Sequence, residues 1–331
     1  MIPYISFLFV ALTIFIIFLM AKTKFGKSIY AVGSNEKTAR LTGISVKGVK
    51  ISVFAVTGVL VGIASFIQAC KIGNVTPASS GTSYEMYAIA AVVLAAAKES
   101  GKYLMIGQNQ RLAKAHSKAK ELIEQGAIGK VLTFRTIFGH GGPETWSVDP
   151  GKNTWFFDKT KAAMGAMAVL GIHKTDMIQY VLGIRIVKTQ AVLTTLDKRD
   201  ATGGLIGVDD NAICIYQMEN GVIGTMTASW TYYAAEDNTT VIYGTKGELR
   251  LYDDPKYSVQ QLGADGTRID YQIDQIQTND NQTAPGIIDL FVDCLVEKKE
   301  PEISGENVLH AMKAVFASIE SSAKGCVVEV K

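Results

Sequence analysis

The first hundred residues carry two long, almost uninterrupted apolar runs. Residues 2–20 read IPYISFLFVALTIFIIFLM and residues 51–69 read ISVFAVTGVLVGIASFIQA, and neither run contains a charged residue. Each is long enough to cross a hydrocarbon core of about 30 Å as a helix. The pattern therefore predicts two transmembrane helices. A third apolar stretch, residues 87–97, is too short to span.

Two other interpretations of these runs stay open. A signal peptide requires basic residues before its apolar stretch, whereas Lys22, Lys24 and Lys27 follow the first run. A buried helix of a soluble core would also explain the second run. The four-residue spacing of Gly58 and Gly62 favours a membrane helix, because paired small residues let helices approach closely in lipid.

The segment between the two runs is strongly basic. It holds seven Lys and Arg residues and a single acid, Glu36. Basic loops stay on the cytoplasmic side of a membrane, so this loop is expected there. The chain after the second run would then lie outside.

From Lys98 the pattern becomes that of a water-soluble chain. Residues 102–107 form a short apolar run that predicts a buried strand. Residues 112–125 predict a helix that ends at two glycines, and residues 131–138 predict a second strand. A strand, a helix and a strand in this order are typical of α/β proteins.

The rest of the chain predicts a large sheet with helices. A helix is expected over residues 165–182, and helices over 286–297 and 305–322 precede a short final strand at 327–330. Six strand-like runs separated by turn signals lie between them, at residues 186–196, 211–217, 222–232, 239–243, 248–252 and 257–262. The expected class is α/β: an α+β C-terminal domain on a mixed or antiparallel sheet, preceded by two transmembrane helices.

The composition argues against nucleic-acid binding, a metal site and a disulfide framework. A net charge of +2 without a dense Lys/Arg stripe argues against a nucleic-acid partner. The four cysteines are far apart and show no CxxC or Cys/His ligand spacing. We therefore expect neither a metal site nor a disulfide framework.

Two segments between residues 20 and 94 carry a family resemblance. They read TKFGKSIYAVGSNEKTARLTGISVKGVK and NVTPASSGTSYEMYAIAAVVL. The first resembles the cytoplasmic coupling loop of ribose-type ABC transporter permeases, and the second resembles the outside segment and following helix of that family. The resemblance implies a lipid bilayer and an ABC ATPase subunit, bound through residues 22–50, as partners. Two spans alone cannot line a transport pathway, so transport by this chain is not expected.

Four segments after residue 96 carry a second resemblance. They read AKESGKYLMIGQNQRLAKAHSKAKELIEQGAIGKV, GAMAVLGIHKTDMIQYVLG, YGTKGELRLY and ENVLHAMKAVFASIESSAKGCVVEV. Their order resembles the Gfo/Idh/MocA oxidoreductases, which include glucose–fructose oxidoreductase and inositol dehydrogenases. The resemblance implies NAD or NADP as cofactor, a sugar or polyol as substrate, a cytoplasmic enzyme, and a homo-oligomer formed through the C-terminal sheet.

His173 and Asp176 are the predicted catalytic residues. Helix positions i and i+3 share a face, and an imidazole that titrates near neutral pH suits proton transfer to or from a hydroxyl. A structural role is the alternative for a lone helical histidine. The Gfo/Idh/MocA resemblance places the family's catalytic histidine at His173. The aspartate that the family carries four residues earlier is Val169 here, which cannot accept a hydrogen bond.

Asn109, Gln110 and Arg111 follow the predicted strand that ends at Gly107. Strand ends of an open α/β sheet face the ligand crevice, and the resemblance indicates that these residues line the cleft of the cofactor. A surface arginine in a salt bridge is the alternative for Arg111.

Three further features are assigned from their local sequence. His140 in the loop GHGGP and Trp155 are assigned to the substrate cleft, although clustered aromatic residues are also common in plain cores. The loop is not a nucleotide fingerprint, since Glu144 replaces the required glycine. The acidic pairs at 209–210 and 253–254 are assigned to turns and solvent.

The dinucleotide-binding signature is missing. No G-x-G-x-x-G occurs in the sequence, and the family's Glu-Lys-Pro motif is absent before AKESGK. We therefore predict a composite chain with a permease-like membrane fragment (1–95), a remnant of the Rossmann domain (96–130) and a substrate and oligomerisation domain (131–331). It is expected at the cell membrane, without bound NAD(P) and without activity. A fragment of a sugar ABC permease and a membrane-anchored sugar-binding module are the alternatives.

Overall fold

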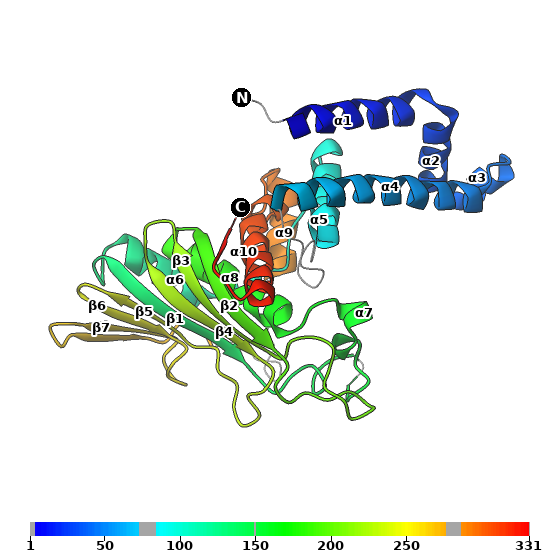
Figure 1. The fold of residues 1–331 in the computed structure, drawn as a ribbon. Coiled ribbons are helices and arrows are strands. Elements are labelled where there is room, and N and C mark those ends of the chain that lie inside the picture. Colours follow the sequence, from blue (N-terminus) through cyan, green and yellow to red (C-terminus); the bar gives the residue numbers. More distant parts are fainter. Residues whose placement is uncertain (1–3, 73–83, 149, 276–285, 331) are drawn as a thin grey trace. The chain divides into compact units, whose positions relative to one another are not determined.

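The computed structural model describes residues 4–72, 84–148, 150–275 and 286–330. The chain separates into two compact units, Met1–Gly81 and Thr82–Lys331. Figure 1 shows that the first is made of helices and the second is built on a large sheet.

The described part of the N-terminal unit contains four helices: α1 (Tyr4–Lys22), α2 (Lys24–Ser34), α3 (Glu36–Leu41) and α4 (Val46–Ile72). Thr23 caps α2 by accepting a hydrogen bond from the backbone N–H of Gly26, and Asn35 caps α3 in the same way. Val32, Ala39 and Val46 form a small buried cluster that holds α2, α3 and α4 together.

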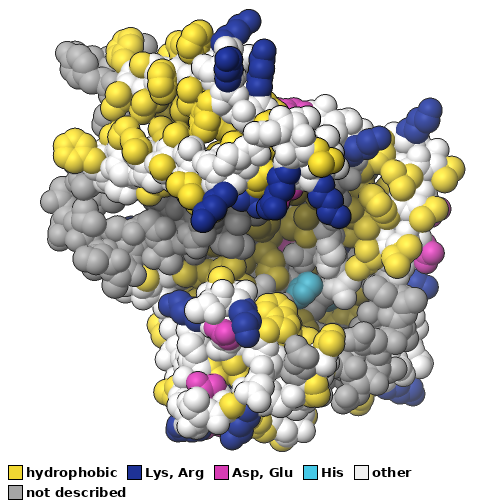
Figure 2. Space-filling model, turned by 90° about the vertical axis from the view of Figure 1, so that its right-hand side faces the viewer, with side chains coloured by type: hydrophobic (Ala, Val, Ile, Leu, Met, Phe, Trp, Pro, Cys, Tyr) yellow, Lys and Arg dark blue, Asp and Glu magenta, His cyan; other side chains and the backbone are white. Residues whose placement is uncertain are grey.

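One described helix is long and apolar enough to cross a membrane. It is the part of α4 over Val46–Ile67, with a mean hydropathy of 2.0. The helices Phe7–Lys22 and Lys24–Ser34 pass the same test only as a pair, bent by 71° at their break. The structure thus supports one span, or two if the bent pair counts as one, and does not confirm two separate spans. Figure 2 shows hydrophobic side chains beside Lys and Arg on this unit.

The second unit is built on a nine-stranded sheet in the order β8-β7-β6-β5-β1-β4-β3-β2-β9. Strands β1 and β4 run parallel, and the other neighbours are antiparallel. This mixed sheet confirms the predicted α/β class. Its strands are β1 (Val131–Gly139), β2 (Ile186–Thr194), β3 (Asn211–Met218), β4 (Ile223–Ser229), β5 (Thr240–Gly244), β6 (Gly247–Leu251), β7 (Val259–Gly263), β8 (Arg268–Tyr271) and β9 (Val328–Glu329).

Helices cover one face of this sheet. Helix α10 packs on β2, α8 packs on β1, and α6 packs on β6 and β7. The helical elements of the unit are α5 (Tyr84–Glu99), the 3₁₀ turn η1 (Asn109–Leu112), α6 (Lys114–Glu124), the 3₁₀ turn η2 (Trp155–Phe157), α7 (Lys159–Ala162), the π-helical turn η3 (Met167–Gly171), α8 (Ile172–Leu182), α9 (Ile287–Glu297) and α10 (Gly305–Lys324).

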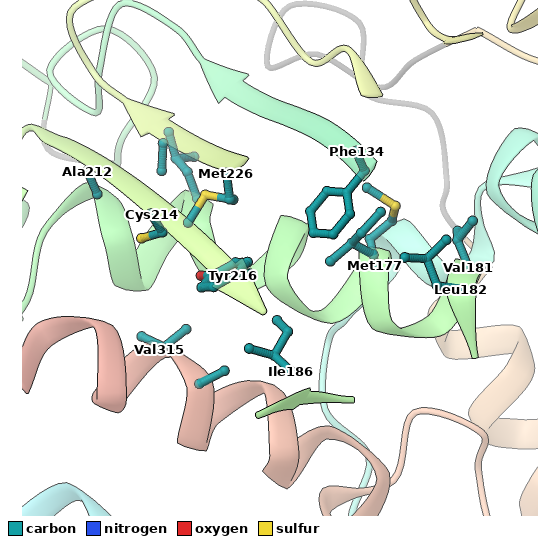
Figure 3. Packing of buried hydrophobic residues seen from close by; sticks show 14 of the residues in the cluster. Phe134, Met177, Val181, Leu182, Ile186, Ala212, Cys214, Tyr216, Met226 and Val315 are labelled. Carbon is teal, nitrogen blue, oxygen red and sulfur yellow. The ribbon is translucent and has the colours of Figure 1, made fainter. Parts of the chain in front are cut away.

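The core lies between the sheet and these helices. Along β3 the side chains alternate: Cys214 and Tyr216 are buried against the helices, whereas Ile213 and Ile215 face outward. Figure 3 shows Tyr216 and other large side chains of the sheet facing those of α8 and α10. Burying one large apolar side chain stabilises a fold by roughly 1.5–3 kcal/mol, so this layer accounts for much of the unit's stability.

Two sequence predictions in this unit need correction. The strand expected at residues 102–107 is absent, because the structure contains only an isolated bridge between Met105 and Ser304 there. A short apolar run cannot form a ladder without neighbouring strands. Strand β8 (Arg268–Tyr271) was not predicted, since its mostly polar sequence hides its place at the edge of the sheet. The other predicted strands and helices are confirmed within a few residues.

Candidate functional site

The entry to α8 is fixed by Asp209, which lies just before β3. Its carboxylate accepts hydrogen bonds from the backbone N–H of Gly165 at 3.0 Å and of Met167 at 2.8 Å. A side chain at Gly165 would place its Cβ 1.9 Å from the carbonyl oxygen of Asp209, so only glycine fits. This anchor sets the π-helical turn η3 and therefore the position of the next residues on α8.

His173 lies in the first turn of α8, where it is half-buried. Its Nδ1 atom is buried and has no hydrogen-bond partner among the described residues. Burial and the neighbouring Lys174 lower the pKa of His173 to about 4. The imidazole is therefore neutral near pH 7, with a free nitrogen that can bind a polar ligand atom.

Lys174 is fully buried, and the sequence interpretation overlooked it. Its Nζ donates a hydrogen bond to the backbone oxygen of Asn238 at 2.9 Å and lies 5.9 Å from the ring centre of Phe138. Burial lowers the pKa of Lys174 to about 7, although the charges of Asp237 and Glu236 oppose the shift. The signal available in the sequence was its spacing, three residues before the apolar Met177 on the inward face.

A chain of aromatic rings leads away from His173. Phe138 lies 6.4 Å from His173 and 5.7 Å from His140, measured between ring centroids. His140 is 6.0 Å from Trp146, which contacts Phe156 at 5.2 Å. Phe156 in turn stacks on the partly exposed Trp155 at 4.0 Å.

We call these rings the aromatic wall, and its six members are Phe138, His140, Trp146, Trp155, Phe156 and His173. The wall links both residues that the sequence assigned to the substrate cleft, His140 and Trp155, to the predicted catalytic histidine. Ligand sites are commonly lined by aromatic rings with a few polar atoms among them.

Arg111 and Asp176 bind each other. Nε and Nη2 of Arg111 each contact one carboxylate oxygen of Asp176 at 2.6 Å, and the side chains are 10% and 2% exposed. Arg111 also donates to the backbone oxygens of Glu302 and Asn307 at 3.3 and 3.2 Å. Burial raises the pKa of Asp176, and the guanidinium opposes this shift. The pair thus ties η1 to α8 and to the start of α10.

Asn109 and Gln110 present unpaired acceptors. Oδ1 of Asn109 and Oε1 of Gln110 are buried without hydrogen-bond partners in the described structure, as is Oε1 of the preceding Gln108. All three belong to or adjoin η1, which packs against α8. Unpaired buried oxygens of this kind are expected to meet a water molecule or a ligand hydroxyl.

The acidic pair at 209–210 is structural, and its assignment to turns and solvent was wrong. Asp210 is fully buried and accepts hydrogen bonds from the backbone N–H groups of Leu196, Asp197 and Lys198 at 2.8, 2.9 and 2.9 Å. A local sequence pattern cannot reveal this burial, because the loop that Asp210 holds lies more than ten residues away. The pair at 253–254 does lie in a turn, where Asp254 accepts from the N–H of Lys256.

The described residues offer little to a metal ion or a dinucleotide. Among them, no group of three or more His, Cys, Asp or Glu side chains is placed to hold a metal. The described residues 96–130 contribute the single Met105–Ser304 bridge, η1 and α6, with no Gly-rich turn between a parallel strand and a helix. A pyrophosphate is normally bound by such a turn, so these residues do not fit NAD(P).

Two different protein families match different parts of the chain. Residues 116–250 match the GFO/IDH/MocA C-terminal domain, and residues 1–115 match the permease component of branched-chain amino acid transport systems. The chain joins parts of these two families. Both resemblances seen in the sequence are thereby confirmed, and the larger part of this chimeric chain is an oxidoreductase-type region.

Named relatives agree with this division. The chain is 31% identical over 173 residues to levoglucosan dehydrogenase of Pseudarthrobacter phenanthrenivorans, covering 46% of this chain and 43% of that protein. It is 41% identical over 100 residues to the xylose transport system permease protein XylH of Haemophilus influenzae, covering 30% and 26%. The chain thus spans less than half the length of these curated relatives.

A solved structure supports the fold of the second unit. Levoglucosan dehydrogenase in complex with NADH and L-sorbose aligns with a TM-score of 0.61 and 26% identity, covering 73% of this chain and 69% of that one. The N-terminal part of the chain is therefore similar to sugar permeases, and the remainder is similar to a sugar dehydrogenase.

Proposed function

We propose that the oxidoreductase-type region binds a sugar or polyol at the aromatic wall, against His173. The single observation that carries this proposal is the free, buried Nδ1 atom of a neutral His173 within the aromatic wall. A neutral imidazole nitrogen accepts a hydrogen bond from a hydroxyl, and aromatic rings pack against the apolar face of a sugar. Similarity to levoglucosan dehydrogenase supports a carbohydrate ligand.

The predicted site residues take distinct roles in this proposal. His173 binds the reactive hydroxyl and is placed to accept its proton. Asn109 and Gln110 supply acceptor oxygens for further hydroxyls. Asp176 acts through Arg111, because both its oxygens bind that guanidinium, and so it positions η1 instead of touching the ligand.

We propose further that this chain does not hold NAD(P) by itself and is therefore inactive as a dehydrogenase. The support is the absence of G-x-G-x-x-G from the sequence and the poor fit of the described residues 96–130. The corresponding domain division is a membrane fragment at 1–95, a Rossmann remnant at 96–130 and a substrate and oligomerisation domain at 131–331.

Calorimetry on the full chain in detergent micelles tests both statements. Levoglucosan, L-sorbose and myo-inositol are titrated without cofactor, and at least one is expected to bind, with His173→Ala abolishing the heat. Absence of binding by all three would refute the sugar site. NADH is titrated separately, and saturable, stoichiometric NADH binding would refute the second statement alone.

A homo-oligomer through the sheet is the proposed assembly. The face of the sheet opposite the helices carries four apolar side chains that are 47–63% exposed: Val192, Ile213, Ile215 and Ile223. Exposed apolar patches of this kind on a sheet are typical of protein interfaces.

A second candidate function belongs to the N-terminal unit. We propose that it lies in the cell membrane and that residues 22–50 bind an ABC ATPase subunit. The supporting observation is the buried cluster of Val32, Ala39 and Val46, which gives this basic segment a defined helical shape. Co-purification of a sugar-importer ATPase with the full chain, and its loss when Arg40 and Lys37 are both changed to Glu, would support the proposal.

A further inference from the structure

We propose that Glu144, held in place by Lys198, is a specificity-determining residue that accepts a hydroxyl of a neutral sugar and excludes sugar acids. This inference rests on the proposed sugar site and names the class of ligand within it. Neither residue was a candidate in the sequence, where Glu144 marked only the failure of a nucleotide fingerprint.

Lys198 and Glu144 form a partly buried ion pair. Nζ of Lys198 binds Oε1 of Glu144 and the backbone oxygen of Gly141, and the two side chains are 4% and 21% exposed. On its other side Nζ faces the ring of Tyr233, 4.4 Å from the centroid. The hydroxyl of Tyr233 donates to Asp197 at 2.6 Å, which fixes the ring in this position. The positive charge is therefore fully enclosed by protein groups.

The second oxygen of the carboxylate remains open. Oε2 of Glu144 is buried and has no partner in the described part of the chain. Gly142 leaves room for it, because a Cβ there would lie 2.5 Å from Oε2, and the φ angle of +101° also favours glycine. The loop thus presents an unpaired carboxylate oxygen, a group that carries a high cost when it lacks a hydrogen-bond donor.

The loop that carries this acceptor also carries hydrogen-bond donors. Nε1 of Trp146 is buried and also lacks a partner in the described structure. Nδ1 of His140 accepts the backbone N–H of Gly142 at 2.9 Å, so a neutral His140 carries its proton on Nε2. Burial and Lys198 lower the pKa of His140 to about 4, which keeps it neutral near pH 7. All these groups belong to the aromatic wall or to its loop.

One charged acceptor with neighbouring neutral donors matches a hydroxyl-bearing ring. A hydroxyl can donate to Oε2 and accept from an indole or imidazole N–H. A carboxylate ligand would instead face Oε2 of Glu144, a second acceptor with no proton to share, while Nζ of Lys198 already binds Oε1 and the backbone oxygen of Gly141. Juxtaposed like charges disfavour binding strongly when water is excluded.

The test measures the affinity of the full chain, in detergent micelles, for D-glucose and D-glucuronate by calorimetry. The wild type is expected to favour glucose. Glu144→Gln, which keeps the shape and the bond to Lys198, is expected to weaken glucose binding by about tenfold or more and to reduce the preference over glucuronate by a similar factor. Trp146→Phe removes the indole donor while keeping an aromatic ring, and it is expected to weaken glucose binding as well.

Glu121→Gln is the matched control, because it changes an exposed pair with Lys118. It should leave both affinities unchanged. If the wild type binds glucose and Glu144→Gln alters neither the affinity nor the preference, this inference fails while the sugar site stands. If the wild type binds neither glucose nor any of the three ligands above, the sugar site and the inference fail together. Thermal unfolding of each variant separates loss of recognition from loss of folding.

Discussion

Arg111 and Asp176 are 65 positions apart in the sequence, yet both of their N···O contacts measure 2.6 Å. The two N–H···O contacts make this a charge-assisted, bidentate pair. It joins η1 to α8, which are far apart in the sequence. The sequence assigned one partner to the cofactor and the other to catalysis. Their burial against each other indicates that they hold η1, and with it Asn109 and Gln110, against α8.

Asp176→Ala is expected to lower the free energy of unfolding by about 3–5 kcal/mol, because it leaves the guanidinium buried without its counter-charge. Urea unfolding followed by tryptophan fluorescence measures the effect. All three tryptophans of the chain lie in the second unit, so the signal reports on that unit. Glu121→Ala, at an exposed ion pair, is the control and should change little. An unchanged urea midpoint for Asp176→Ala would show that the pair does not stabilise the fold.

Local sequence patterns predicted most strands of the sheet, but they did not predict the order in which those strands lie side by side. The strand over residues 211–217 is visible in the sequence as a short apolar run between turn signals. The parallel contact between β1 and β4 joins Thr133 to Ile223, and nothing in either strand specifies the other. Strand order depends on such non-local pairing, which a single sequence does not display.

Only the candidate site residues that belong to a recognisable motif could be predicted from the sequence. His173 was proposed through a family resemblance, and its ring lies 6.4 Å from that of Phe138, within the aromatic wall. Lys198 and Glu144 were missed, and Asp210 was wrongly assigned to solvent, because charged residues in a loop sequence look solvated. Their burial arises from contacts with loops elsewhere in the chain, as between Lys198 and Glu144.

Asp210→Ala is expected to destabilise the second unit by about 3 kcal/mol, since three backbone N–H groups lose a buried, charged acceptor. The loop over residues 196–198 should also become sensitive to limited proteolysis. Asp200→Ala removes a comparable turn contact, to the N–H of Thr202, at an exposed position and serves as control. Equal urea midpoints for these two variants would contradict the structural role of Asp210.

His116 makes the second unit sensitive to acid. It is fully buried, its Nδ1 bonds the backbone oxygen of Gln110 at 2.7 Å, and burial together with Lys174 lowers its pKa to about 3. The unfolded chain then binds more protons between pH 6.5 and 3, so stability falls as the pH drops through this window, by up to about 1.4 kcal/mol per unit.

His116→Asn keeps a donor near the position of Nδ1 and removes the titration. The slope of unfolding free energy against pH, measured in urea between pH 6.5 and 4.5, should be shallower in this variant. His140 and His173 titrate in both proteins, so the difference between the two slopes isolates His116. Parallel slopes would mean that His116 does not titrate on unfolding.

Ile215→Arg is expected to disrupt the proposed oligomer. This side chain is 47% exposed on the open face of the sheet, where an arginine would place a charge in an apolar contact. Light scattering of the detergent-solubilised chain should show a mass of several copies for the wild type and a single copy for the variant. Leu205→Arg, at a 49% exposed loop position, should keep the wild-type mass. A wild type that is already monomeric would refute the assembly.

Lys174 should make stability rise with pH on the alkaline side. Burial lowers its pKa from 10.5 to about 7, so between these values the unfolded chain binds more protons than the folded one. The free energy of unfolding then increases with pH from 7 toward 10, by up to about 1.4 kcal/mol per unit.

Lys174→Met is expected to abolish this slope, although the bond to the backbone of Asn238 is lost as well. Because the charge of Lys174 helps to lower the pKa of His173, the variant should also shift the NMR titration of His173 upward from about 4. Lys188→Met, at a 45% exposed position, is the matched control and should keep both the alkaline slope and the histidine titration. If Lys174→Met retains the wild-type slope, the buried amine is not the titrating group, and its influence on His173 must come from the geometry of α8 instead of its charge.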